Sequence, residues 1–245
     1  MPLMEHPAFK RPSRGSTLWR YMDLAKFVDL LARRALFFPA ADRLGDPLEG
    51  SYPPANRSIR EGLYGGNDVD LLTRRRHHLA QATVVSCWHV NRRESAAMWE
   101  IYARTGSGIA IRTTFGDLLD SLTSDPSRPD RREIYAGMVK YIDFEKETID
   151  ESTHLSPFIH KRLSFEYEHE VRLVVGESRD TYRGWQSARR SHGEYFDVDP
   201  RILIRRVYVA PQARDWVKDV VQAVVTKFGL ELKVERSEMD KTPFI

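Results

Sequence analysis

Two glutamates and an arginine occupy alternate positions in the stretch FEYEHEVRLVV, residues 165–175. Glu168, Glu170 and Arg172 alternate with mostly apolar residues, and strict alternation is typical of a β-strand with two unlike faces. On one face of such a strand the arginine can keep both carboxylates ionised. One carboxylate can then act as a general base while the other orients a nucleophile. A solvated strand face that carries an ion pair is the alternative, and the sequence leaves both open.

Two further strands carry polar and aromatic candidates. In LWRYM, residues 18–22, the Arg20 guanidinium can bind phosphate and Tyr21 can stack on a ring. The same aromatic residues can instead belong to the core, with Arg20 at its rim. VVSCWHV, residues 84–90, reads as a strand buried on both faces that carries Ser86 and Trp88. Its cysteine, Cys87, is predicted to be a small buried core residue.

An acidic loop, DRLGDPLEG at residues 42–50, supplies a different kind of candidate. Its spacing does not fit an EF-hand, and a turn held by the Asp46 side chain is the favoured interpretation. Asp46 and Glu49 could instead join Glu168 and Glu170, with Lys161 nearby in sequence, to bind Mg²⁺ in a nuclease. The favoured interpretation assigns no metal ligand.

Composition narrows the class of protein. The chain has 245 residues, of which 41% are hydrophobic and 30% charged, with a net charge of +3. These values are ordinary for a globular protein, and the net charge alone does not imply binding to a polyanion. One cysteine excludes an internal disulfide framework and a cysteine zinc cluster, which favours a reducing cytoplasm. The N-terminus lacks the apolar core of a signal peptide, and no apolar run is long enough for a membrane span.

The pattern of elements predicts an α+β fold with a mixed, mainly antiparallel sheet flanked by helices. Residues 1–16 are expected to form a flexible lead, and residues 17–245 a single domain. The predicted helices lie at 23–35, 67–80, 92–104 and 211–229, and the last has Pro211 in its first turn and Gly229 past its end. A polar loop or hairpin is expected at 178–193. A short strand is expected at the start of the stretch 35–54, before a loop rich in Gly and Pro. The other predicted strands lie at 17–22, 82–90, 106–115, 134–144, 165–175, 202–210 and 230–236.

Taken together, these motifs resemble a bacterial family catalogued only as a domain of unknown function, family 2971. The resemblance runs over residues 17–210 through LWRYM, GDPLEG, the block from SCW to MWEIY, and KRLSFEYEHEVRLVV. The sequence departs from the family pattern at Gly45, where Asn is usual, and at Phe165, where Trp is common. This resemblance implies no activity.

A more distant resemblance is to ADP-ribosyltransferases of the arginine-serine-glutamate type, because Arg20, Ser86 and Glu168-x-Glu170 occur in that order on predicted strands. It implies that NAD is the substrate, without a Rossmann fingerprint, and that the protein acts in a toxin or phage-defence setting. Arg20 would hold the pyrophosphate. Glu170 would hydrogen-bond the ribose and stabilise positive charge, Glu168 would orient or deprotonate the acceptor, and Arg172 would support both. Tyr21, Trp88 or Trp99 would stack on nicotinamide. The acceptor, whether protein, nucleic acid or small molecule, stays open, as does a third reading as a non-catalytic interaction module.

Overall fold

The structure is a computed structural model, and it describes residues 3–64, 77–103, 106–122, 133–176 and 192–240. It contains helices and an eight-stranded mixed sheet, so the predicted α+β class is confirmed. The chain divides into two compact units, each assembled from three separate stretches. The first comprises residues 1–11, 37–87 and 125–195, and the second residues 12–36, 88–124 and 196–245. No helix in the described ranges has both the length and the apolar character needed to span a membrane.

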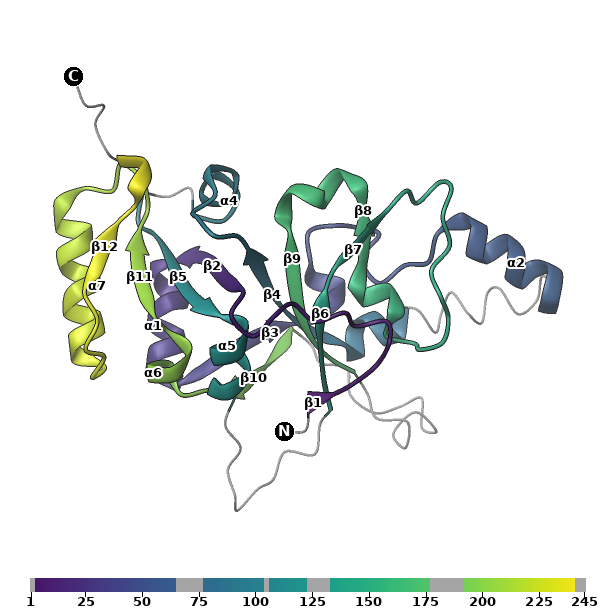
Figure 1. The fold of residues 1–245 in the computed structure, drawn as a ribbon, viewed down its shortest axis with the longest axis horizontal. Helices are drawn as coiled ribbons and strands as arrows, with labels where there is room; N and C mark the ends of the chain where they lie inside the picture. The colour runs from purple at the N-terminus through teal and green to yellow at the C-terminus, as the bar shows by residue number, and fades with distance from the viewer. Residues whose placement is uncertain (1–2, 65–76, 104–105, 123–132, 177–191, 241–245) are drawn as a thin grey trace, which may run out of the picture. The chain divides into compact units, whose positions relative to one another are not determined.

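In the first unit, strand β9 pairs antiparallel with β6, and β6 pairs parallel with β1. A separate parallel pair joins β7 and β8. The elements of this unit are β1 (Leu3–Met4), η1 (Ala41–Arg43), α2 (Pro54–Tyr64), β6 (Ile134–Met138), β7 (Lys140–Ile142), η2 (Ser156–Ile159), β8 (His160–Arg162), η3 (Leu163–Glu168) and β9 (Glu170–Val175). Figure 1 labels most of them.

In the second unit, β5 pairs antiparallel with both β2 and β11, and β11 pairs parallel with β12. Helix α7 packs along β11 and β12, as Figure 1 shows. The elements of this unit are β2 (Thr17–Asp23), α1 (Leu24–Arg33), α4 (Ala96–Tyr102), β5 (Gly108–Thr114), α5 (Phe115–Ser121), α6 (Pro200–Leu203), β11 (Arg206–Val209), α7 (Asp215–Lys227), β12 (Val234–Arg236) and η5 (Glu238–Asp240). Three strands contain residues of both units: β3 (Ala35–Pro39), β4 (Val84–Val90) and β10 (Gly193–Asp197).

Local sequence signals explain several of these elements. The Asp23 side chain caps α1 by accepting a hydrogen bond from the Lys26 backbone N–H at 2.8 Å. Helix α7 buries Val217, Val221 and Val225 and ends before Gly229, whose φ of 72° favours glycine. The predicted helix at 211–229 is therefore confirmed, although it begins only at Asp215.

The predicted strand at 165–175 is wrong in its first half. Residues 163–168 form the 3₁₀ helix η3, His169 adopts a left-handed conformation with φ of 39°, and β9 begins at Glu170. All six residues of β9 are buried, so the strand has no solvated face. Glu168 and Glu170 therefore do not share a strand face, because an abrupt change of backbone direction separates them.

The remaining predictions concern the N-terminal residues, two helices, a loop and strand β4. Residues 3–16, expected to be a flexible lead, contain β1 and the buried Phe9, so they are not separate from the fold. Helix α2 was not predicted, and the predicted helix at 67–80 falls mostly outside the described residues. The same holds for the loop or hairpin expected at 178–193. Strand β4 is mostly buried along its length, as predicted.

Candidate functional site

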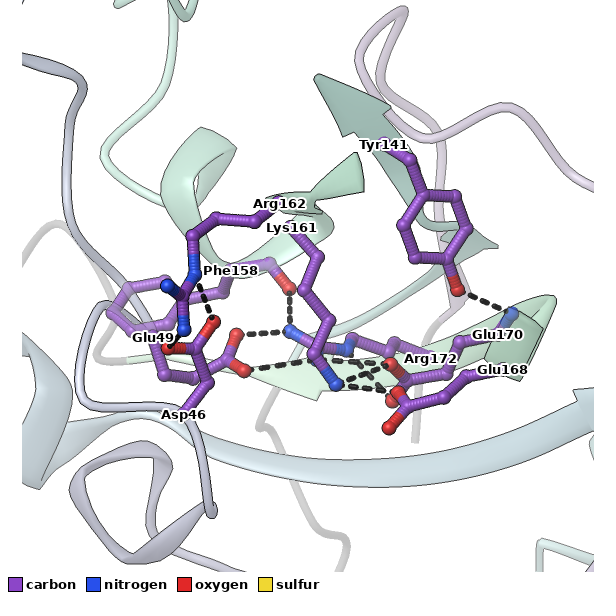
Figure 2. A network of polar contacts seen from close by, with 9 residues as sticks. All are labelled: Asp46, Glu49, Tyr141, Phe158, Lys161, Arg162, Glu168, Glu170 and Arg172. Carbon is purple, nitrogen blue, oxygen red and sulfur yellow. Dashed lines mark hydrogen bonds and ion pairs between the residues drawn. The ribbon is translucent and has the colours of Figure 1, made fainter. Parts of the chain in front are cut away.

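The Arg172 guanidinium is the centre of a buried polar network in the first unit (Figure 2). Only 1% of the Arg172 side chain is exposed. Its Nε donates to Glu170 Oε1 at 2.9 Å, and its Nη2 donates to Glu170 Oε2 at 3.0 Å. Glu49 accepts from Nη1 and, at 3.1 Å, from Nη2, while the Phe158 carbonyl oxygen accepts from Nη1 at 2.8 Å. These contacts use all five N–H donors of the guanidinium, which explains how a charged group can be buried here.

Lys161 connects this arginine cluster to Glu168. Its Nζ lies 2.5 Å from Glu168 Oε2 and 3.6 Å from Glu170 Oε2. The side chains of all three residues are at most 9% exposed. Strand β8 supplies Lys161, η3 supplies Glu168 and β9 supplies Glu170, so three successive elements meet at one ammonium group.

Three buried carboxylates of the network share two cations. Glu49, Glu168 and Glu170 pair with Lys161 and Arg172. Among these five side chains, one negative charge is in excess when all three carboxylates are ionised. Because an isolated buried charge is costly, the network should retain a proton more readily than exposed carboxylates do.

The two glutamates that contact Lys161 have pKa values displaced in opposite directions. Burial raises the pKa of Glu168 above its ordinary value, and Lys161 only partly offsets this effect. Burial also acts to raise the pKa of Glu170, but the charges of Arg172 and Lys161 outweigh it, so the pKa of Glu170 is lowered. Glu170 is therefore the fixed anion of the pair, and Glu168 is the group suited to exchange a proton.

The loop that carries Asp46 and Glu49 is tied to the network at two points. Arg162 Nη2 donates to Asp46 Oδ1 at 2.7 Å, and Arg172 binds Glu49. Asp46 Oδ1 also accepts from the Leu48 backbone N–H at 3.0 Å, which confirms the predicted turn held by the Asp46 side chain. The loop thus contributes its acids to ion pairs with arginines.

Two polar groups border the pair formed by Glu168 and Glu170. The Tyr141 hydroxyl oxygen accepts from the Glu170 backbone N–H at 2.9 Å, and burial raises the Tyr141 pKa above its ordinary value. The Cys87 thiol hydrogen-bonds to Glu170, and burial raises its pKa well above the usual value. Cys87 is therefore kept as a thiol. It was predicted to be a buried core residue, but it is only partly buried and packs against the edge of a core cluster.

The predicted cofactor-binding residues belong to both units. Ser86 lies on β4 in the first unit and is fully buried. Arg20, Tyr21, Trp88 and Trp99 lie in the second unit. Because the units are described separately, the convergence of Arg20, Ser86 and Glu170 stays a prediction.

The aromatic candidates of the second unit pack against protein. Trp88 is 1% exposed, Trp99 3% and Tyr21 8%. The Tyr21 ring meets the Trp99 ring edge to face with centroids 5.0 Å apart, and the Arg20 guanidinium lies over the Trp88 ring at 5.4 Å. These contacts fit the core interpretation of the aromatic residues, with Arg20 half-buried at the rim. Their predicted stacking on nicotinamide stays a prediction.

The four acids proposed for a nuclease are placed differently from a metal site. Asp46 pairs with Arg162, Glu49 and Glu170 pair with Arg172, and Glu168 pairs with Lys161. Within the described ranges, no group of three or more His, Cys, Asp or Glu side chains is arranged to hold a metal ion. Each of these four acids is thus ion-paired with a lysine or an arginine, and Glu49 and Glu170 share Arg172.

Sequence reasoning missed two contributors to the site, Tyr141 and Arg162. Neither residue belongs to the motif at 165–175, and their contacts depend on the packing of β7 and β8 against the turn into β9. The adjacent basic residues at 161 and 162 were the available signal. They precede the glutamates by less than ten positions, and Lys161 does pair with them. Arg162 instead pairs with Asp46, 116 positions away, which no local spacing indicates.

A family model matches a segment of the chain that carries part of this site. No curated protein matches the chain. Residues 98–173 match the family model described as "Protein of unknown function (DUF2971)". The matched segment includes Lys161, Glu168, Glu170 and Arg172, whereas Asp46 and Glu49 lie before it. The match supports the predicted resemblance to that family of unknown function over this segment.

Proposed function

We propose that the buried network is the acid–base centre of an NAD-dependent enzyme resembling ADP-ribosyltransferases. The observation that carries the proposal is the position of the Lys161 ammonium between Glu168 and Glu170, whose pKa values are displaced in opposite directions. Two carboxyl groups that titrate apart take different roles in acid–base catalysis. The ionised Glu170 would supply fixed negative charge, and Glu168 would move the proton.

The roles follow from the contacts of each carboxylate. Both oxygens of Glu170 accept hydrogen bonds from Arg172, so this residue is better suited to stabilising positive charge than to binding a ribose hydroxyl. In the proposed reaction, the bond between the ribose C1′ and the nicotinamide nitrogen breaks, and its electron pair leaves with nicotinamide. The acceptor then forms a bond to C1′ and gives its proton to Glu168.

Two observations support NAD as the substrate. The fixed negative charge of Glu170 suits a reaction in which positive charge develops on the ribose. The order of Arg20, Ser86 and Glu168-x-Glu170 along the chain matches the order in arginine-serine-glutamate transferases. The first supports the chemistry, and the second supports the identity of the substrate.

The test measures the rate at which nicotinamide is released from NAD, with water or an added acceptor present. Chromatography quantifies the released nicotinamide. Glu168→Gln should lower the rate by about 100-fold or more, the usual contribution of a general base. Glu166→Gln is the matched control, because Glu166 is an exposed residue of the same 3₁₀ helix. No nicotinamide release by the wild-type protein, or equal rates for wild type and Glu168→Gln, would reject the proposal.

A second candidate function is a non-catalytic interaction module stabilised by the same network. The observation in its favour is burial: Glu170 is 5% exposed and Arg172 is 1% exposed. In that case NAD should leave the melting temperature unchanged, because only a ligand that binds the native state stabilises it. Measuring the melting temperature with Mg²⁺ and with EDTA tests the nuclease alternative, which predicts stabilisation by Mg²⁺.

A further inference from the structure

The aromatic ring of Phe165 lies against the cations of the site. Its centroid is 4.5 Å from Lys161 Nζ and 5.3 Å from Arg162 Cζ. Both distances fall within the range in which a cation is attracted to the face of a ring. The same Lys161 Nζ contacts the carboxylates of Glu168 and Glu170, so Phe165 is the apolar neighbour of a group that both glutamates share.

The geometry of η3 explains why Phe165 reaches this position. Residues three apart in a 3₁₀ helix project from the same side, which places Phe165 with Glu168. Phe165 is half-buried, whereas its neighbours Ser164, Glu166 and Tyr167 are exposed. Among these four residues, Phe165 is thus the one that the helix turns toward the network.

We infer that Phe165 is a positioning residue of this site, and that its ring covers the pair formed by Lys161 and Glu168 and limits the access of water to it. Its effect on turnover rests on the proposed function, but its effect on the pair does not. The ring combines two properties that an aliphatic or polar side chain would not combine. It is an apolar cover, and its face attracts the ammonium that hydrogen-bonds to Glu168.

Removal of the cover has a defined electrostatic consequence. Burial is the largest cause of the raised pKa of Glu168, so admitting water should lower that pKa toward its ordinary value. The charged or titratable groups around Glu168 are Lys161 on β8, Glu170 and Arg172 on β9, Tyr141 on β7 and the exposed neighbour His169. The pKa values of Lys161, Arg172 and Tyr141 are raised and that of Glu170 is lowered, so these four groups keep their charge states while Glu168 titrates.

The experiment is a pH titration of the full-length protein labelled with ¹³C at the glutamate carboxyl carbons, with the Glu168 resonance assigned from Glu168→Gln. Phe165→Ala should move the Glu168 titration to lower pH than in wild type. Phe165→Gln, which is polar and fills more space than alanine, should move it in the same direction if truncation to alanine impairs folding. Phe165→Trp, which keeps an aromatic cover, should retain the wild-type titration.

Leu163→Ala is the matched control, because Leu163 is an apolar residue of the same 3₁₀ helix that is 50% exposed. An unchanged Glu168 titration in Phe165→Ala and Phe165→Gln, or an equal shift in Leu163→Ala, would overturn the inference. If NAD is cleaved, the acid limb of the pH–rate profile should move with the titration. The carboxyl titration tests Phe165 even in a protein that does not cleave NAD, so failure of the proposed function and failure of this inference are distinguishable.

Discussion

Replacement of Arg172 by methionine is the sharpest test of the network. Methionine has an unbranched, apolar side chain, so the substitution keeps much of the packing of the arginine stem. It removes all five hydrogen bonds that the guanidinium donates. It leaves Glu49 and Glu170 buried without their shared cation, at 8% and 5% exposure. Breaking a buried ion pair from one side destabilises a protein strongly, because the remaining charge has lost both water and its partner.

The expected loss is about 3–5 kcal/mol in the free energy of unfolding, the usual range for removing one partner of a buried ion pair. A whole domain is commonly stable by only about 5–15 kcal/mol, so the variant should fold but with a reduced margin. For a chain of this size, 1 kcal/mol corresponds to roughly 2–4 °C in melting temperature, which predicts a decrease of about 6–20 °C.

The assay is thermal unfolding followed by circular dichroism, with urea unfolding as a second measure. The matched control is Arg206→Met, which removes an arginine from an exposed ion pair with Glu235 and should change the melting temperature little. The triple variant Arg172→Met, Glu49→Gln and Glu170→Gln should recover much of the loss, because it removes the buried charges together. A decrease below about 2 °C in Arg172→Met would refute the reasoning, since it would mean that neither carboxylate depends on Arg172.

Two other substitutions test the packing of the loop at Gly50 and the ionisation of Glu170 on β9. Gly50→Ala should destabilise the protein by about 2–4 kcal/mol in urea unfolding, because φ is +65° and a Cβ would lie 2.4 Å from the buried Phe158 ring. Gly229→Ala, with φ of +72° but open space around it, should lose less, and equal losses would contradict the steric argument. Because the pKa of Glu170 is lowered from 4.5, its stabilisation is present above pH 4.5 and is lost as the pH falls through the folded-state value. The decline in melting temperature below pH 4.5 should therefore be shallower in Glu170→Gln, and an identical decline would show that Glu170 is not the responsible group.

The sequence alone was sufficient where the signal is local. The proline and glycine that flank α7 and the apolar run of β4 are signals within a few residues, so they predicted a helix and a strand correctly. The charges of Glu168, Glu170 and Arg172 also identified the part of the chain where the network lies. The local pattern predicted the wrong element at η3. The alternation of residue types there is typical of a strand, but the backbone is a 3₁₀ helix that turns at His169 before β9 begins.

Tertiary structure decided which charges meet and what each contact does. Arg172 and Glu49 are 123 positions apart, and no local spacing indicates that they pair. The opposite pKa displacements of Glu168 and Glu170 likewise depend on burial and on the placement of Lys161 and Arg172 around them. The sequence by itself determined the charged groups and most of the local elements. Their ionisation was decided only by the fold, because desolvation and charge proximity are properties of three-dimensional packing.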